Sequence, residues 1–207
     1  MQNGRYTKFF FLLYIFTGVW YYSTMKSVYE CCPILQGNFV KLELVTAADA
    51  KPLLDCYSDE KAVPFFNSDN CHGDDFHYTA IEQMKQAVAF WLFSYEKGYF
   101  VRMTIKNFTT NEILGTIEIF HRKAQDYFND CALLRIDLKS SAEKQAIITD
   151  ILCLCQNELM PFFDTNRIVT KAVPAAQERI VSLKKLGYVL CSNKLLDQYD
   201  NYWELVK

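Results

Sequence analysis

From residue 38 onward, the chain alternates between short runs with a hydrophobic period of two and longer runs with a period of about 3.6. The first kind of run predicts a strand, and the second predicts a helix. In chain order the runs predict β-α-α-β-β-β-α-β-α-β-β, with no internal repeat and no low-complexity segment. This order is typical of one mixed α/β sheet with helices on both faces.

The element boundaries follow from the same pattern and from the residues that end it. Strands are predicted at residues 38–45, 99–106, 112–122, 131–138 and 167–173, and in the runs YVLCS and NYWELVK. Helices are predicted at residues 46–60, 79–97, 142–159 and 174–186. Gly98 and Gly187 end two of these helices, because glycine readily adopts the left-handed conformation found at a helix C-terminus. We expect the aromatic residues to fill the core, among them Phe65, Phe66, Trp91 and Phe93.

Composition limits the class of protein. A chain of 207 residues with 51% hydrophobic residues has enough apolar material for a core but is short for two ordinary domains. A net charge of −2 and scattered basic residues argue against nucleic-acid binding. The eight cysteines are also scattered, so we expect reduced thiols and a cytoplasmic protein.

Metal binding is not expected. Adjacent Cys31 and Cys32 lack a matching CxxC or CxxH partner, which leaves them a weak candidate for a redox or metal site. Cys71, His72 and His77 have a spacing that matches no known metal site, and a solvated loop explains them better.

The N-terminal run FFFLLYIFTGVWYY at residues 9–22 follows Arg5 and Lys8. It is shorter than the about 20 residues needed to span a bilayer, and no A-x-A-like cleavage site follows. We interpret residues 1–24 as an apolar extension outside the fold and residues 25–207 as the domain. A membrane anchor and docking onto the domain are the alternatives, and membrane contact is expected only through residues 9–22.

Four passages of the domain resemble a known superfamily. They are KLELVTAADAKPLLDCYSDEKAVPFF, EILGTIEIFHR, ALLRIDL with the helix after it, and KAVPAAQERIVSLKKLGYVL. The last is the most specific, because it combines a strand, a proline and a helix that ends in Lys-Leu-Gly-aromatic. Together they resemble the GNAT superfamily of acyl-CoA-dependent N-acetyltransferases, close to the branch of the ribosomal-protein-alanine acetyltransferases.

This resemblance implies a single domain with a central, mostly antiparallel mixed sheet of about six to seven strands, splayed at its centre. Acetyl-CoA would be the cosubstrate, with its pantetheine arm in the gap between strands 131–138 and 167–173. Its pyrophosphate would lie on the N–H groups that open the next helix. The cofactor-binding residues implied in this way are Ile136, Leu138, Ser141, Lys144, Gln145 and Ala146.

The pyrophosphate turn departs from the pattern of the family. That pattern is Arg or Gln, two residues, Gly, one residue, then Gly or Ala, and it falls here on residues 143–148, where three positions fail to match. Ser140 and Glu143 have the spacing of a capping box, which predicts a helix that starts a turn early and caps its own N–H groups. Such a box would compete with pyrophosphate, so we predict a degenerate cofactor loop.

The resemblance also implies direct transfer of the acetyl group to a primary amine, which needs a base, an oxyanion donor and often an acid for the thiolate. Glu118 is the first candidate base, because it shares a strand face with Thr116, opposite Ile117 and Ile119; an exposed sheet-face residue is the alternative. Asp137 is the second candidate, with a structural hydrogen bond as the alternative. Leu183 occupies the position of the usual acid, which leaves Tyr202, near the expected substrate mouth, as the catalytic tyrosine candidate.

The loop at residues 67–78 lies where the family shapes its acceptor site. Asp69, Asp74 and Asp75 would favour a cationic amine, either a small molecule or a peptide N-terminus. Two functions therefore stay open: an N-acetyltransferase, monomeric or homodimeric, and a GNAT-fold module that binds a ligand or partner without catalysis.

Overall fold

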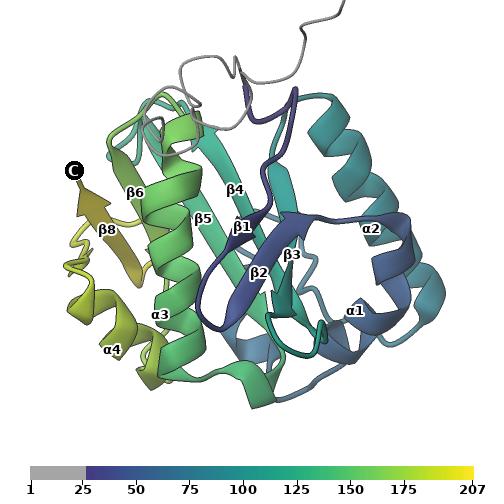
Figure 1. Ribbon diagram of the computed structural model, residues 1–207. Coiled ribbons are helices and arrows are strands. Elements are labelled where there is room, and N and C mark those ends of the chain that lie inside the picture. Colours follow the sequence, from purple (N-terminus) through teal and green to yellow (C-terminus); the bar gives the residue numbers. More distant parts are fainter. Residues whose placement is uncertain (1–26) are drawn as a thin grey trace, which may run out of the picture.

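Eight strands form one mixed sheet, in the order β1-β2-β3-β4-β5-β6-β8-β7, in a computed structural model that describes residues 27–207 (Figure 1). The predicted N-terminal extension, including residues 9–22, falls outside the described residues. The strands are β1 (Leu35–Gln36), β2 (Val40–Leu44), β3 (Val101–Asn107), β4 (Ile113–Arg122), β5 (Cys131–Leu138), β6 (Arg167–Lys171), β7 (Val189–Leu190) and β8 (Tyr202–Val206). Seven of them correspond to predicted strands, and the short β1 was not predicted.

Four α-helices cover the two faces of the sheet (Figure 1). They are α1 (Ala50–Tyr57), α2 (Ile81–Glu96), α3 (Gln145–Leu154) and α4 (Gln177–Lys185). One hydrophobic cluster joins α3 and α4 to one face, and a second joins α1 to α2 on the other. The fold class is therefore the predicted one, a mixed α/β domain with a mostly antiparallel sheet.

Three predicted details were wrong. The helix expected at residues 142–159 begins at Gln145 and ends in a π-turn at Cys155–Leu159. The strand expected at YVLCS is only the two residues of β7. Phe93 is 48% exposed, because it lies on the side of α2 that faces away from the buried Trp91.

Residue alternation along the central strands sorts side chains onto the two faces. Met103, Ile117 and Leu134 pack in the cluster that includes α3, whereas the polar residues Arg102, Thr116, Glu118 and Arg135 lie on the other face. The alternation slips between Ile105 and Lys106, where a β-bulge shifts the register of β4. Gly115 lies at this bulge, and a Cβ atom there would come within 1.9 Å of the Asp137 carbonyl oxygen, so β4 and β5 approach closely only with glycine.

The sheet splays between β5 and β6, its one parallel pair among the described strands. Their backbones pair only from Ala132 to Leu134, opposite Ile168 to Thr170. Beyond Leu134, β5 continues to Leu138 bonded to β4 alone. The predicted gap at the centre of the sheet is thus present.

Two further observations concern the described residues alone. Between residues 27 and 207, no helix has the length and apolarity needed to cross a bilayer, and no three His, Cys, Asp or Glu side chains cluster as metal ligands. All eight cysteines are free thiols, as predicted.

Candidate active site and cofactor cleft

A row of three charged residues crosses β3, β4 and β5 on the face that α1 and α2 cover. Arg102, Glu118 and Arg135 are register partners, so strand pairing alone brings their side chains together. Nη2 of Arg102 donates to Oε2 of Glu118 at 2.9 Å, and Nη1 of Arg135 donates to Oε1 at 2.8 Å. Both oxygens of Glu118 are therefore engaged, and its 3% exposure excludes the exposed sheet-face alternative.

A second polar row lies two residues further along the strands. Thr116 and Asp137 are register partners, and Tyr57 of α1 reaches them from the covering helix. The Tyr57 hydroxyl lies 2.9 Å from Oδ2 of Asp137 and 2.8 Å from Oγ1 of Thr116. Arg102 joins the two rows, since its Nη1 also donates to Oδ2 of Asp137 at 2.9 Å. Oδ1 of Asp137 is buried without a hydrogen-bond partner among residues 27–207.

Arg102 carries the positive charge at the centre of this network. It is 1% exposed, and its guanidinium lies 4.3 Å from the centre of the Trp91 ring. Burial disfavours its charge, but Tyr57, Glu118 and Asp137 together hold the pKa of Arg102 above its ordinary value. The arginine therefore stays ionised beside two carboxylates.

A third polar cluster contains the predicted Tyr202. Its hydroxyl donates to Oδ2 of Asp69 at 2.9 Å, and Nζ of Lys171 lies 2.6 Å from the same oxygen. Arg135 donates to the Asp69 carbonyl at 3.0 Å, which connects this cluster to Glu118. Burial first, and then the Asp69 carboxylate, raise the pKa of Tyr202 far above that of a free tyrosine. Tyr202 itself is 1% exposed.

The acceptor loop presents less free negative charge than its sequence suggests. Asp69 is 9% exposed and is paired with Lys171. Asp74 accepts from the Phe76 N–H and the Tyr78 hydroxyl, so it closes a turn of the loop. Asp75 likewise accepts from the N–H two residues ahead.

Side chains fill most of the gap between β5 and β6. A cavity of about 10 Å³ remains there, lined by Ile136, Thr170 and Lys171 from the strands and by Ile148, Leu152, Arg179 and Leu183 from the helices. A space of this size is about that of one water-sized probe, far below what a pantetheine arm occupies. Ile136 and Leu138 are both buried, and Ile136 lines this cavity.

Arg179 of α4 is one of two charged residues that line this gap, with Lys171. It is 3% exposed, and its Nε lies 3.1 Å from both carboxylate oxygens of Glu143. Its Nη1 donates to the carbonyl of Phe65 at 2.8 Å. The predicted capping box is therefore wrong. Glu143 turns toward Arg179, because a buried guanidinium without a counter-ion costs more than an unmade helix cap.

The chain consequently enters α3 in two steps. A short 3-10 turn at Ser140–Ala142 ends at Glu143, and α3 starts only at Gln145, after an extended Lys144. Instead of Ser140, the carboxylate of Glu178 from α4 caps this helix: its Oε2 accepts the Gln145 N–H at 2.9 Å. The predicted residues Ser141 and Lys144 are exposed nearby.

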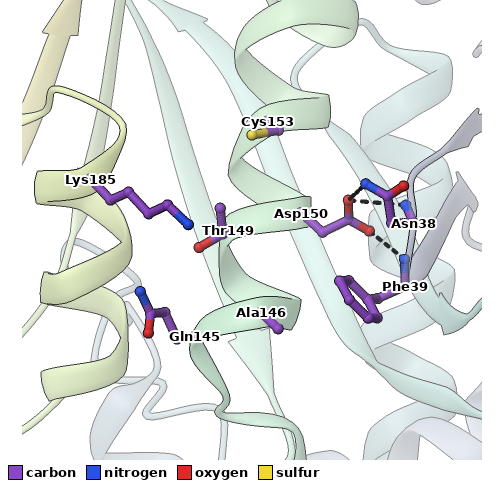
Figure 2. Close-up of a pocket in the computed structure, with 8 residues that line it drawn as sticks. All are labelled: Asn38, Phe39, Gln145, Ala146, Thr149, Asp150, Cys153 and Lys185. Carbon is purple, nitrogen blue, oxygen red and sulfur yellow. Dashed lines mark hydrogen bonds between the residues drawn. The ribbon is translucent and has the colours of Figure 1, made fainter.

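A surface groove of about 350 Å³ begins at the same end of α3 (Figure 2). Its lining combines α3, the turn before β2 and α4, through Asn38, Phe39, Gln145, Ala146, Thr149, Asp150, Cys153 and Lys185. Asp150 fixes the turn by accepting the N–H groups of Asn38, Phe39 and Val40 at 3.1, 2.7 and 3.0 Å. Figure 2 shows Lys185 extending from α4 toward Thr149 on the other side of α3.

The structure thus brings the three predicted catalytic residues into one connected polar network and gathers Gln145 and Ala146 at the opening turn of α3. Sequence reasoning missed the residues that join them, namely Tyr57, Arg102, Arg135, Lys171 and Arg179. A basic residue at mid-strand, such as Arg102, was the one available signal, because a buried charge requires a partner.

Several solved structures of acetyltransferases have a similar arrangement of elements. The enzyme from Salmonella typhimurium that modifies the N-terminal serine of ribosomal protein L7/L12 has a TM-score of 0.63 at 17% identity, over 84% of this chain and 99% of that one. Mycobacterium smegmatis RimJ in complex with CoA-disulfide has 0.62 at 15%, over 84% and 86%. A GNAT-family acetyltransferase from Bacillus anthracis has 0.56 at 11%, over 84% and 98%.

The domain has a GNAT-like fold. At these identities the likeness concerns the fold alone. No protein-family model matches the chain, and no curated protein matches its sequence.

Proposed function

We propose that the protein is an N-acetyltransferase that transfers the acetyl group of acetyl-CoA directly to a primary amine, either a protein N-terminus or a small-molecule amine. The observation that carries the proposal is the parting of β5 and β6 after Leu134, with a network of buried carboxylates on the neighbouring face. Structural neighbours support the cosubstrate, since one of them is a complex with CoA-disulfide.

The residues present fit acetyl-CoA in two ways. Residues 135–138 of β5 have no strand partner on the side of β6, so their backbone groups are available to pair with the amides of pantetheine. At the start of α3, the N–H groups of Ala146 and Ile147 lie in the first turn and have no backbone partner within the described chain. Free N–H groups at a helix N-terminus suit phosphate oxygens, and Lys144 adds a positive charge beside them.

Asp137 is the better candidate for the base. Both oxygens of Glu118 already accept from arginines, whereas Oδ1 of Asp137 has no partner among the described residues. In the proposed step Oδ1 takes the proton of the amine while the amine nitrogen bonds to the thioester carbon. The C–S bond then breaks, and the CoA thiolate leaves and takes a proton from water. Arg102 and Tyr57 hold Oδ2 in place, so Oδ1 keeps its orientation.

Tyr202 has a positioning role in this scheme. Its hydroxyl proton is donated to Asp69, and a raised pKa keeps it there at neutral pH. Tyr202 and Lys171 together fix Asp69, whose carbonyl in turn holds Arg135 against Glu118.

The test measures both the binding of acetyl-CoA and the rate of acetyl transfer. Acetyl-CoA titration by calorimetry should give binding, and thiol release with peptide and small-molecule amines should identify an acceptor. Asp137→Asn should then lower kcat by about 10²-fold or more with little change in acetyl-CoA affinity, as expected for loss of a general base. Asp164→Asn is a matched control on an exposed residue. No heat and no thermal shift at millimolar acetyl-CoA would contradict the proposed function.

A module without catalysis is the second candidate. It is favoured by the closed gap, where Arg179 and Leu183 leave a cavity of only about 10 Å³. Binding of acyl-CoA without thiol release on any amine would support this candidate, and an unchanged rate in Asp137→Asn would transfer the role of the base to Glu118 or to water.

A further inference from the structure

Two carboxylates lie where the proposed cofactor would place its pyrophosphate. Glu143 is paired with Arg179, through both oxygens at 3.1 Å from Nε and through a further contact to Nη2. Glu178, the neighbour of Arg179 on α4, accepts the first N–H of α3 at 2.9 Å. The Glu143 carboxylate therefore contacts a guanidinium, and the Glu178 carboxylate contacts a helix N-terminus. These are the two kinds of donor that bind phosphate best in proteins.

Arg179 is also one of the side chains that close the gap. It lines the small cavity between β5 and β6 together with Leu183 and Ile136, and it is held there by Glu143 and by the Phe65 carbonyl. A guanidinium that turned toward an anion at the start of α3 would leave this space. Phosphate binding and opening of the pantetheine channel would then be one movement.

We propose that Arg179 binds the pyrophosphate of the acyl-CoA at the start of α3. Until the cofactor replaces them, Glu143 occupies the guanidinium of Arg179 and Glu178 occupies the Gln145 N–H. The inference rests on the proposed function, because it concerns the same cleft. It assigns the binding role to α4, whereas the sequence pattern pointed only to the loop before α3. It also explains how a chain without the glycines of the usual turn retains a phosphate site: side chains from a second helix supply what the turn lacks.

The exchange predicts that removing the competing charges tightens binding. In Glu143→Gln/Glu178→Gln, Arg179 loses its counter-ion and the Gln145 N–H its anionic acceptor, so the unliganded state is destabilised while the liganded state is not. The affinities for CoA and for inorganic pyrophosphate should rise by about tenfold or more, since like charge at the site is removed. Glu96→Gln removes one negative charge from an exposed position on α2 and should leave both affinities unchanged.

Arg179 is tested with its partner neutralised. In Arg179→Gln/Glu143→Gln no unpaired charge is buried, so the domain should fold, which circular dichroism and a thermal melt verify. Its affinity for CoA should fall by about tenfold or more, because a bidentate guanidinium contact is lost. Arg179→Lys, used in place of Arg179→Gln, should recover part of that loss in CoA affinity. The amide resonance of Gln145 reports the exchange directly: it should shift when pyrophosphate is added, and in the same direction in Glu178→Gln without ligand.

The outcomes separate this inference from the proposed function. If the parent protein binds CoA and the two double variants bind it equally well, the exchange is wrong and the proposed function stands. If the parent binds none but Glu143→Gln/Glu178→Gln binds it, the carboxylates block the site permanently, and the exchange is wrong for the parent protein. If no variant binds CoA or pyrophosphate, the cleft is no cofactor site and both proposals fail together.

Discussion

Two arginines are buried among the described residues of this domain. The regions around them differ in the backbone that carries the carboxylate partner of each arginine. Arg102 is 1% exposed and Arg179 is 3% exposed, and each is paired with carboxylates. The partners of Arg102 lie on β4, which pairs with β3, and on β5, which pairs with β4; the β3–β4 register is continuous from Arg102 to the bulge after Ile105. The partner of Arg179 is Glu143, which lies with Lys144 in the two-residue link between a 3-10 turn and α3.

This difference decides which ion pair can exchange. Moving Glu118 or Asp137 away from Arg102 would require breaking strand pairs, so that network is fixed by the sheet. Glu143 lies outside the sheet, in the two-residue link before α3, so moving it breaks no strand pair. Burial alone therefore does not distinguish a structural ion pair from an exchangeable one; the backbone that carries the partner does.

The largest effect is expected from the fixed region. Arg102→Met leaves Glu118 and Asp137 with one fewer counter-charge in a buried site, and should cost about 3–5 kcal/mol of unfolding free energy. Urea denaturation measures it. The double variant Arg102→Met/Asp137→Asn leaves Glu118 paired with Arg135, carries no such excess charge and should recover much of the loss. A single variant that loses less than about 1 kcal/mol would mean that water or ions reach the site.

The fold could largely be predicted from the hydrophobic periodicity of the sequence, because this periodicity reflects which face of each element is buried. Seven of the strands and all four helices were predicted in the correct order. The start of α3 was wrong for a physical reason. Ser140 and Glu143 form a good local cap, but Glu143 lies 36 residues from Arg179 in sequence, and a long-range ion pair outweighed the local preference.

The site was readable only in part. Glu118 and Asp137 could be selected because carboxylates at mid-strand are unusual, yet their partners depend on strand register and on how α1 packs. The contact between Asp69 and Lys171 spans 102 residues of sequence, and neither residue belongs to a local motif. Such contacts exist only after the sheet has formed, so local patterns cannot indicate them.

A smaller effect is expected from the exchangeable region. A double-mutant cycle on Glu143→Gln and Arg179→Gln should give a coupling energy of about 1–2 kcal/mol, below the cost at Arg102, because the Glu143 side chain is 9% exposed and better hydrated than that of Glu118, which is 4% exposed. Thermal or urea unfolding of the four proteins measures it. A coupling as large as the loss in Arg102→Met would show that Glu143 is as fixed as Glu118, and the contrast between the two regions would disappear.

The smallest effect concerns the cap on α3. Glu178→Ala removes the acceptor of the Gln145 N–H and one negative charge near the positive end of the helix, which should cost about 0.5–1 kcal/mol of unfolding free energy. Glu178→Gln keeps an acceptor oxygen at the same position and should lose less. Added pyrophosphate should remove the difference between Glu178→Ala and the parent, because its oxygens supply the acceptor that the variant lacks. If the difference persists at saturating pyrophosphate, Glu178 and phosphate do not share the N–H groups of α3, and the cap belongs to the fixed part of the fold after all.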